Sequence, residues 1–175
     1  MNNLLKATLN QELSSEDIKK ICPDAYIMLY EELQQYNDII DAIGPTNVLI
    51  ILFPVQSNHN GHWITVLYHP NMKLVEHFDS YGLSPSQEIG YTNNQYVKEH
   101  LLNNLYKQAT FDGYKVQYNE AKLQQMKQGA NDCGRWASVR GIMKGLTNQE
   151  FANLFLNQKL APDSLICLMT FLFTI

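Results

Sequence analysis

The chain has 175 residues, of which 45% are hydrophobic and 17% are charged, and this length and balance predict one compact domain over residues 1–175. Its formal net charge of −4 provides no sequence-wide positive field for a phosphate backbone, so we expect no nucleic-acid partner. Three widely spaced cysteines build neither a disulfide framework nor a zinc knuckle, and the N-terminus lacks a signal peptide, so we expect reduced thiols in an intracellular protein.

The first part of the chain predicts a helix start, a longer helix and then a buried strand. Ser14 and the acidic residues that follow it are typical of a helix start, and apolar residues at helical spacing predict a helix over 24–43. The aliphatic run 47–53 has the composition of a strand that is buried on both faces, and Pro54 should end it. A polar loop is expected over 56–61.

The remaining segments predict a hairpin, one more strand and four helices. Strand-like runs at 63–69 and 73–79 flank a short turn, which favours a β-hairpin. The last expected strand is 114–118, and the expected helices are 93–109, 133–146, 148–157 and 163–173. Together these elements predict an α+β domain with a small, mostly antiparallel sheet packed between helices. The longest apolar run, 165–175, is too short to span a membrane, so we expect no membrane partner.

The predicted hairpin brings His62 and Asp79 onto one face. Antiparallel partners have a constant sum of residue numbers, and pairing of His69 with Met72 puts His62 directly opposite Asp79. A turn that is longer by two residues makes them diagonal neighbours on the same face, still within reach. A carboxylate beside an imidazole fixes its tautomer and stabilises its protonated form. The spacing fits such a catalytic pair and equally a surface pair without a function.

Cys133 lies where a polar loop gives way to a predicted helix. A thiol in the first turn of a helix is close to the positive end of the helix dipole, which favours the thiolate. Gly134 would let a substrate backbone approach closely, and Gln128 would place an amide beside the Cys133 backbone N–H as an oxyanion hole. A buried inert cysteine and a solvated glutamine fit the same local sequence, so catalysis is indicated only by the combination.

In chain order these residues resemble a known superfamily of cysteine peptidases. The motifs are Phe53-Pro54, Gly61-His62-Trp63, Phe78-Asp79-Ser80-Tyr81-Gly82, Gln128 and Asp132-Cys133-Gly134. Over roughly residues 48–143 this combination resembles the adenovirus-protease and SUMO-protease superfamily, which is related to the papain-like cysteine proteases. The hairpin motifs are most similar to the adenovirus-protease-like branch, and Cys133-Gly134-Arg135-Trp136 resembles the maturation proteases of virophages and Polinton-type elements.

The resemblance implies roles for individual residues. By position, the catalytic residues are His62, Asp79, Cys133 and the oxyanion-hole residue Gln128, and the substrate-binding residues are Trp63 and Gly134. Trp63 would help to form a narrow channel that favours glycine beside the scissile bond. The family's glutamine usually lies a residue or two farther upstream of the cysteine, so Gln124 and Gln125 remain alternative oxyanion donors.

The function implied by the resemblance is a viral cysteine endopeptidase that cleaves polypeptides at glycine-containing sites and matures capsid or other virion precursors. We expect no metal and no other cofactor, and the resemblance allows for a peptide activator. We expect it in the host cytoplasm or a virus factory, or packaged in the virion. Three alternatives remain: an isopeptidase for ubiquitin-like modifiers, a non-catalytic binding module with the protease fold, and a metal site built from His59, His62 and Cys133, which lacks a recognisable ligand spacing.

Overall fold

The computed structural model of the protein describes residues 8, 10–57, 60–91, 100–125 and 131–174. Its strands are β1 (Tyr26–Leu29), β2 (Val48–Ser57), β3 (Asn60–His69), β4 (Leu74–Phe78) and β5 (Lys115–Tyr118). Its helices are α2 (Ser15–Ile21), α3 (Ile39–Ile43), α4 (Pro85–Tyr91), α5 (Leu101–Phe111), α6 (Cys133–Ile142), α7 (Asn148–Leu156) and α8 (Pro162–Thr170), with 3-10 turns η1 (Tyr30–Gln35), η2 (Pro70–Met72) and η3 (Phe171–Phe173).

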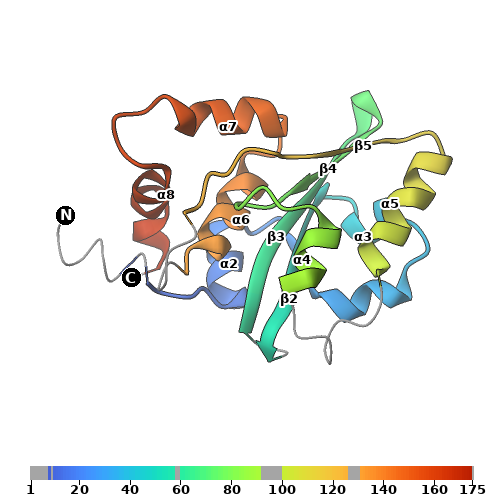
Figure 1. The fold of residues 1–175 in the computed structure, drawn as a ribbon, viewed down its shortest axis with the longest axis horizontal. Helices are drawn as coiled ribbons and strands as arrows, with labels where there is room; N and C mark the ends of the chain where they lie inside the picture. Colours follow the sequence, from blue (N-terminus) through green and yellow to red (C-terminus); the bar gives the residue numbers. More distant parts are fainter. Residues whose placement is uncertain (1–7, 9, 58–59, 92–99, 126–130, 175) are drawn as a thin grey trace.

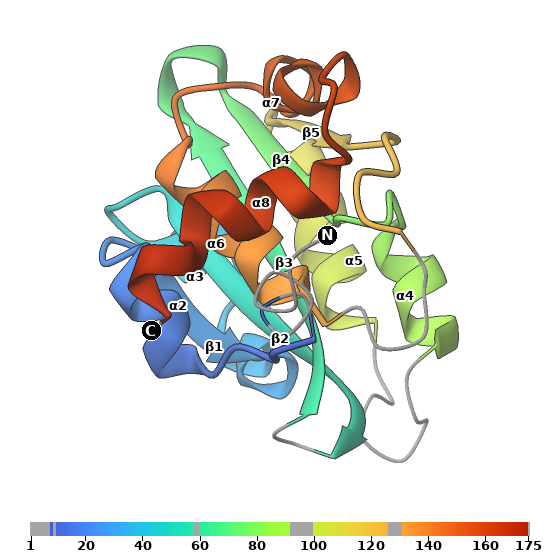
Figure 2. The same ribbon diagram turned by 90° about the vertical axis from the view of Figure 1, so that its left-hand side faces the viewer.

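The molecule has three layers, with the sheet between two groups of helices (Figure 1). Helices α2, α6, α7 and α8 lie on one side of the sheet, and α3, α4 and α5 lie on the other, as the view in Figure 2 also shows. The five strands follow chain order across the sheet. The central strands β2, β3 and β4 pair antiparallel, whereas β1 and β5 join the edges in parallel. The predicted fold class is therefore confirmed.

Strand β2 is buried on both faces, as its unbroken aliphatic sequence predicts. Ile51 and Phe53 pack in the core on the α3 and α5 side, whereas Ile50 and Leu52 pack in the core on the α2 and α6 side. Pro54 does not end the strand, and the predicted polar loop 56–61 is mostly strand. Pairing with β3 continues through an irregularity after Pro54, because a proline without an N–H is tolerated at a β-bulge.

The predicted helix over 24–43 is wrong. This segment forms strand β1, the 3-10 turn η1 and the short helix α3. Tyr30 and Leu33 are both buried because the two residues are three apart in a 3-10 turn, which mimics the spacing of a helix. Asp38 then starts a separate helix, since its side chain accepts a hydrogen bond from the Ile40 N–H at 2.7 Å.

The later elements agree with the prediction apart from their ends. The expected helix over 93–109 is observed as α5 from Leu101 onwards, and residues 92–99 lie outside the described part of the chain. Helix α6 begins at Cys133 as predicted but ends at Ile142, and the last predicted helix divides into α8 and η3. Helix α4 was not predicted. Within the described residues, no helix has both the length and the hydrophobicity that crossing a bilayer requires.

Helix α6 is held against the sheet by buried polar contacts as well as by packing. The Thr65 hydroxyl on β3 donates a hydrogen bond to the carbonyl of Ala137 at 2.9 Å. One turn later, the Arg140 guanidinium donates to the Glu76 carboxylate on β4 at 2.9 Å. These contacts fix the direction of α6, so its first residue, Cys133, lies at a defined position relative to β3 and β4.

Candidate active site

His62 and Asp79 contact each other, and the hairpin that carries His62 has the strand register expected for the turn that is longer by two residues. His69 faces Leu74 in the β3–β4 hairpin, so the sum of paired residue numbers exceeds that of the direct pairing by two. His62 and Asp79 are therefore diagonal neighbours, one of the two arrangements expected from the sequence. Nε2 of His62 lies 2.5 Å from Oδ2 of Asp79. This contact leaves Nδ1 as the other ring nitrogen that can exchange a proton.

Asp79 is buried and its carboxylate is held by several donors. Its Oδ1 accepts hydrogen bonds from the backbone N–H groups of Tyr81 at 2.6 Å and Leu83 at 3.3 Å. Its own backbone exchanges two hydrogen bonds with the Asn119 side chain, at 2.8 and 2.7 Å. Burial acts to raise the pKa of Asp79, but the charge and hydrogen bond of His62 outweigh burial and lower the pKa to about 2. Asp79 is consequently ionised at neutral pH.

The chain reverses directly after Asp79 in a turn that requires a glycine. Gly82 has a φ of +73°, and its N–H donates to the Asp79 carbonyl at 2.9 Å. A Cβ atom at this position would also lie 2.9 Å from the Glu120 carbonyl oxygen. The turn places the Tyr81 ring on the His62 ring, with centroids 5.0 Å apart and an interplanar angle of 27°.

Cys133 is a second interaction partner of His62, besides Asp79. Burial acts to lower the pKa of His62, but the charge and hydrogen bond of Asp79, followed by a hydrogen bond and the charge of Cys133, hold the pKa well above its usual value. The His62 side chain is still 14% exposed. The ring therefore lies between a carboxylate and a thiol and remains accessible from outside.

Cys133 is the most accessible of the three cysteines. It is half-buried at the first position of α6, whereas Cys22 and Cys167 are buried. Burial raises the pKa of the Cys22 thiol, and burial raises the pKa of the Cys167 thiol to about 12. Of the three thiols, only that of Cys133 combines access with a neighbouring histidine.

Gln124, one of the alternative oxyanion donors, forms hydrogen bonds inside the protein. Its Nε2 donates to Oδ1 of Asp132 at 2.5 Å, and its Oε1 accepts from the Ser80 hydroxyl at 2.5 Å. Both ends of the amide are thus used, and the side chain is buried. The side chain of Gln125 is exposed, and Gln128 lies outside the described residues.

Trp63 and Gly134 pack against each other. Trp63 Nε1 donates to the Leu13 carbonyl at 3.1 Å, and the Trp63 side chain is 8% exposed. Gly134 is buried, and a Cβ atom there would lie 3.0 Å from Leu13 and 3.2 Å from Trp63. The sequence interpretation that Gly134 makes room for a substrate is therefore corrected, because its missing side chain makes room for Leu13 and Trp63. Trp63 also lines a hollow of about 380 Å³ next to Leu29.

Sequence reasoning missed three residues around the pair. Tyr81 lies in the quoted motif without an assigned role, Asn119 follows β5, and Glu88 belongs to the unpredicted helix α4. Ligand atoms of His62, Asp79 and Glu88 lie within 4.8 Å of one another, and they form the one such group found among the described residues. A metal ion there would have to displace the hydrogen bond between His62 and Asp79. The other metal hypothesis includes His59, which is not among the described residues.

Comparison with known proteins identifies solved structures with a similar fold. No family model matches the chain. The crystal structure of the ASFV pS273R protease matches with a TM-score of 0.54 and 13% identity, covering 95% of this chain and 69% of that chain. The Ulp1 protease domain, in complex with the yeast SUMO orthologue Smt3, gives a TM-score of 0.41 and 10% identity, covering 99% of this chain and 76% of that chain. The likeness to the pS273R protease confirms the fold that the sequence resemblance predicts.

A relative in sequence is protein V9 of Sputnik virophage. The two proteins are 30% identical over 167 residues, which cover 90% of this chain and 93% of V9. This similarity extends over nearly the whole of both chains. The chain belongs to the family of Sputnik virophage protein V9.

Proposed function

We propose that the protein is a cysteine protease in which Cys133 is the nucleophile, His62 the general base and Asp79 the residue that orients the base. The observation that carries this proposal is the set of partners of the His62 ring, which lies 2.5 Å from the Asp79 carboxylate and also interacts with the Cys133 thiol. A protein that only binds peptides has no need of this arrangement. The fold shared with the pS273R protease supports the same conclusion.

The three side chains suffice for both steps of peptide hydrolysis. His62 accepts the thiol proton through Nδ1, because Nε2 faces Asp79. The Cys133 sulfur attacks the carbonyl carbon of the scissile bond, and the intermediate collapses as the C–N bond breaks and the imidazolium protonates the leaving amine. Water then attacks the thioester with His62 as base, which releases the carboxylic acid and restores the thiol.

The developing oxyanion is stabilised at the N-terminus of α6. The backbone N–H of Cys133 belongs to the first turn of this helix, where N–H groups have no partner within the helix. We assign the second donor to the Gln128 side chain, on the family resemblance alone. We assign Gln124 a different role, because its amide is bonded to Ser80 and Asp132.

We propose that the substrates are viral precursor proteins that are cut at glycine-containing sites. Trp63 follows the base directly in sequence and belongs to the hydrophobic cluster against which Cys133 packs, so it is near enough to the thiol to restrict the side chains of a substrate. The related V9 protein belongs to a virophage, which supports a viral role. On this proposal, capsid or other virion precursors are matured by the protease.

The test is cleavage of a diverse peptide library, with sites read by mass spectrometry and with the virion precursor proteins assayed beside it. We expect cleavage with glycine next to the scissile bond. Cys133→Ala and His62→Ala should abolish cleavage, whereas Asp79→Asn should retain more activity because it only loses the orientation of the base. Cys22→Ala is the matched control, since it removes a buried thiol outside the site.

Each outcome decides a different part of the proposal. Cleavage that survives Cys133→Ala would refute the mechanism. Cleavage without a preference for glycine would refute the substrate assignment and leave the mechanism. Release of ubiquitin-like modifiers with no cleavage of library peptides would favour the isopeptidase alternative, and peptide binding without any turnover would favour the binding module.

A further inference from the structure

Buried polar side chains continue behind Asp79, away from His62. Oε1 of Glu88 lies 3.3 Å from Nε2 of His77, and Nδ1 of His77 lies 3.0 Å from the Tyr106 hydroxyl. Glu88, His77 and Tyr106 are at most 3% exposed. Side-chain atoms of Glu88, Asp79 and His62 also lie within 4.8 Å of one another. The row of buried polar side chains Tyr106, His77 and Glu88 therefore ends at the proposed catalytic pair. The peptidase mechanism itself does not use Glu88.

Glu88 and Asp79 are two neighbouring buried carboxyl groups, and ionising both would be costly. Asp79 has His62 and two backbone N–H groups to stabilise its charge. Oε2 of Glu88 is buried and receives no hydrogen bond from a donor, so nothing compensates a negative charge there. Burial, and then the charge of Asp79, raise the pKa of Glu88 well above its usual value. The proton therefore belongs on Glu88.

The hydrogen bonds of His77 select the oxygen of Glu88 that carries this proton. Burial lowers the pKa of His77 to about 4, so its ring is neutral and has one donor and one acceptor nitrogen. Burial raises the pKa of Tyr106, so its hydroxyl keeps its proton and, in the Nε2–H tautomer of His77, donates a hydrogen bond to Nδ1. Nε2 of His77 then donates to Oε1 of Glu88. The remaining oxygen, Oε2, holds the proton.

We propose that Glu88 is a positioning residue that stays protonated and donates a hydrogen bond from Oε2 to the Asp79 carboxylate. The inference rests on the proposed function only in that Asp79 orients the catalytic base. A neutral Glu88 supports Asp79 without adding a second negative charge. An ionised Glu88 would stabilise the imidazolium further and make His62 a poorer proton donor to the leaving amine.

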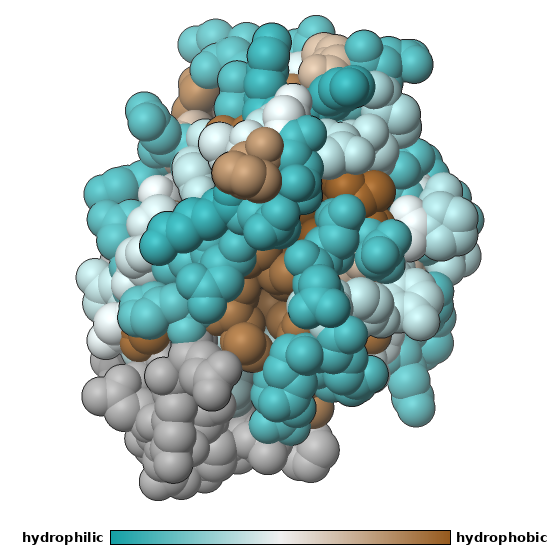
Figure 3. Space-filling model, turned by 90° about the vertical axis from the view of Figure 1, so that its right-hand side faces the viewer, coloured by the Kyte–Doolittle hydropathy of each residue, from teal (hydrophilic) through white to brown (hydrophobic). Residues whose placement is uncertain are grey.

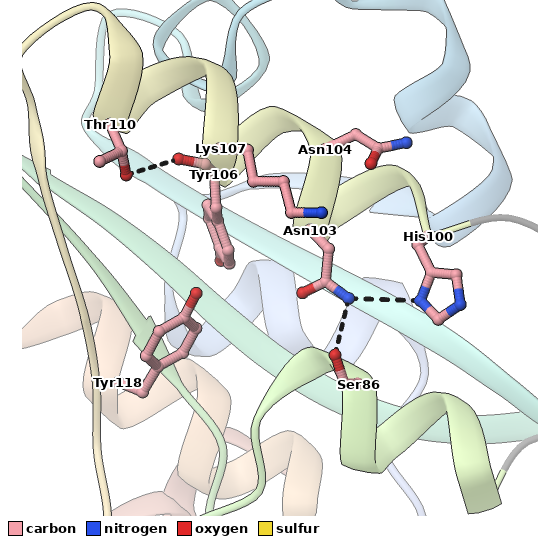
Figure 4. Close-up of a pocket in the computed structure, with 8 residues that line it drawn as sticks. All are labelled: Ser86, His100, Asn103, Asn104, Tyr106, Lys107, Thr110 and Tyr118. Atoms are coloured by element: carbon pink, nitrogen blue, oxygen red, sulfur yellow. Dashed lines mark hydrogen bonds between the residues drawn. The ribbon is translucent and has the colours of Figure 1, made fainter.

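Tyr106, at the outer end of the row of buried polar side chains, has a neighbour that offers a matched control. Tyr106 lines an open pocket of about 680 Å³ between α4, α5 and β5, where Tyr118 stands opposite it (Figure 4). Tyr118 contacts both aromatic rings, with centroids 5.8 Å from Tyr106 and 5.7 Å from His77. This side of the molecule is largely hydrophilic around a hydrophobic hollow (Figure 3). Tyr118→Phe thus removes a hydroxyl from the same pocket and leaves Tyr106, His77 and Glu88 in place.

The titratable groups that face Glu88 come from four elements. They are His62 on β3, His77 and Asp79 on and after β4, Tyr106 on α5, and Tyr118 on β5 through its contact with Tyr106 and His77. Of these, only His62 and Asp79 are charged at neutral pH, with opposite signs. A change in the charge of Glu88 therefore registers most directly in the titration of His62.

The first measurement is the infrared difference spectrum between the wild-type protein and Glu88→Gln at neutral pH, in the presence of EDTA. We expect the variant to lose the carbonyl band of one protonated carboxyl group. The other carboxyl groups, including Asp132, whose pKa burial raises to about 7, are present in both proteins and cancel. Loss of carboxylate bands alone would overturn the proposal, as would a protonated band that appears only when EDTA removes a bound metal.

The second measurement is the His62 pKa by NMR, which needs no substrate. Glu88→Gln keeps a donor to Asp79 and changes no charge if Glu88 is neutral, so we expect the His62 pKa to stay within about 0.3 unit. A fall of about one unit or more would show that the variant has removed a negative charge, and the proposal would be wrong. Tyr106→Phe should shift the His77 signals, whereas Tyr118→Phe should leave their hydrogen-bonded pattern in place.

Kinetics add a readout that mere structural support would not move. Glu88→Gln should keep kcat within about threefold, whereas Glu88→Leu, which has no donor, should lower kcat about tenfold or more with KM unchanged. Equal losses in both variants would refute a hydrogen-bonding role. If no peptide is cleaved at all, the proposed function fails while the infrared and NMR results still decide the state of Glu88. Those two results on Glu88→Gln also decide the matter if Glu88→Leu does not fold.

Discussion

Cys133 differs from the other cysteines in access and in its neighbour, and this difference is testable without a substrate. Iodoacetamide should alkylate Cys133 much faster than Cys22 or Cys167 at neutral pH, because burial raises the pKa of both other thiols and His62 contacts Cys133. Mapping the adducts by mass spectrometry checks the prediction. His62→Ala should slow alkylation of Cys133 at least about tenfold, since the thiolate loses its cationic partner. Faster labelling of either buried cysteine in the folded protein would contradict the assignment.

The sequence could predict His62 and Asp79 because strand pairing follows simple arithmetic. Parity alone puts both side chains on one face, and the two registers considered differ only in whether the pair is direct or diagonal. The role of Glu88 could not be read in the same way. Glu88 reaches its partner His77 only through the packing of α4, and α4 has only seven residues with little periodicity.

At the scale of elements, the Gln124 amide links the two parts of the site. It joins Ser80, next to Asp79, to Asp132, next to Cys133, and both hydrogen bonds are 2.5 Å long. Helix α6 and the turn after β4 are thereby held in one relative position. In the sequence, Gln124 is an alternative oxyanion donor because the family's glutamine usually lies farther upstream of the cysteine than Gln128 does. Contacts between segments so far apart in sequence leave no local pattern from which these two hydrogen bonds could be predicted.

Two reactions distinguish the structural role of Gln124, which links α6 to the turn after β4, from the role of an oxyanion donor. Alkylation of Cys133 forms no tetrahedral oxyanion, whereas peptide cleavage does. Gln128→Ala should lower kcat at least about tenfold and leave the rate of alkylation unchanged. Gln124→Ala should lower both, because it moves the thiol relative to His62. The exposed Gln125 is the control, and Gln125→Ala should change neither. If Gln124→Ala affects cleavage only, Gln124 would be the oxyanion donor, and its assigned role of holding α6 and the turn after β4 together would be wrong.

Over the whole molecule, the sheet and the C-terminal helices meet at a buried ionic cluster. Glu76 on β4 accepts hydrogen bonds from Arg140 on α6 at 2.9 Å, from the Asn148 N–H at the start of α7, and from His69 on β3 at 2.9 Å. Arg140 also donates to the Asn148 side chain and lies over the Phe151 ring, 5.3 Å from its centroid. The overall fold was predictable from composition and periodicity, whereas this cluster was not, because polar residues at buried positions break the hydrophobic pattern.

Arg140→Met should strongly destabilise the protein, because it leaves the Glu76 charge buried without its cationic partner. Burial acts to lower the pKa of Arg140 and Glu76 acts to raise it, with a result of about 10, so Arg140 is charged at neutral pH. Breaking one side of such a pair costs roughly 3–5 kcal/mol, or about 6–20 °C in Tm for a chain of this size. Adding Glu76→Gln to Arg140→Met removes the orphaned charge and should recover at least half of the loss. Lys20→Met, which breaks an exposed ion pair with Asp17, is the control and should cost less than about 1 kcal/mol. Urea unfolding followed by circular dichroism measures these three variants and the single variant Glu76→Gln against the wild type. A double variant as unstable as the sum of its single variants would show that the Glu76 and Arg140 charges do not stabilise each other.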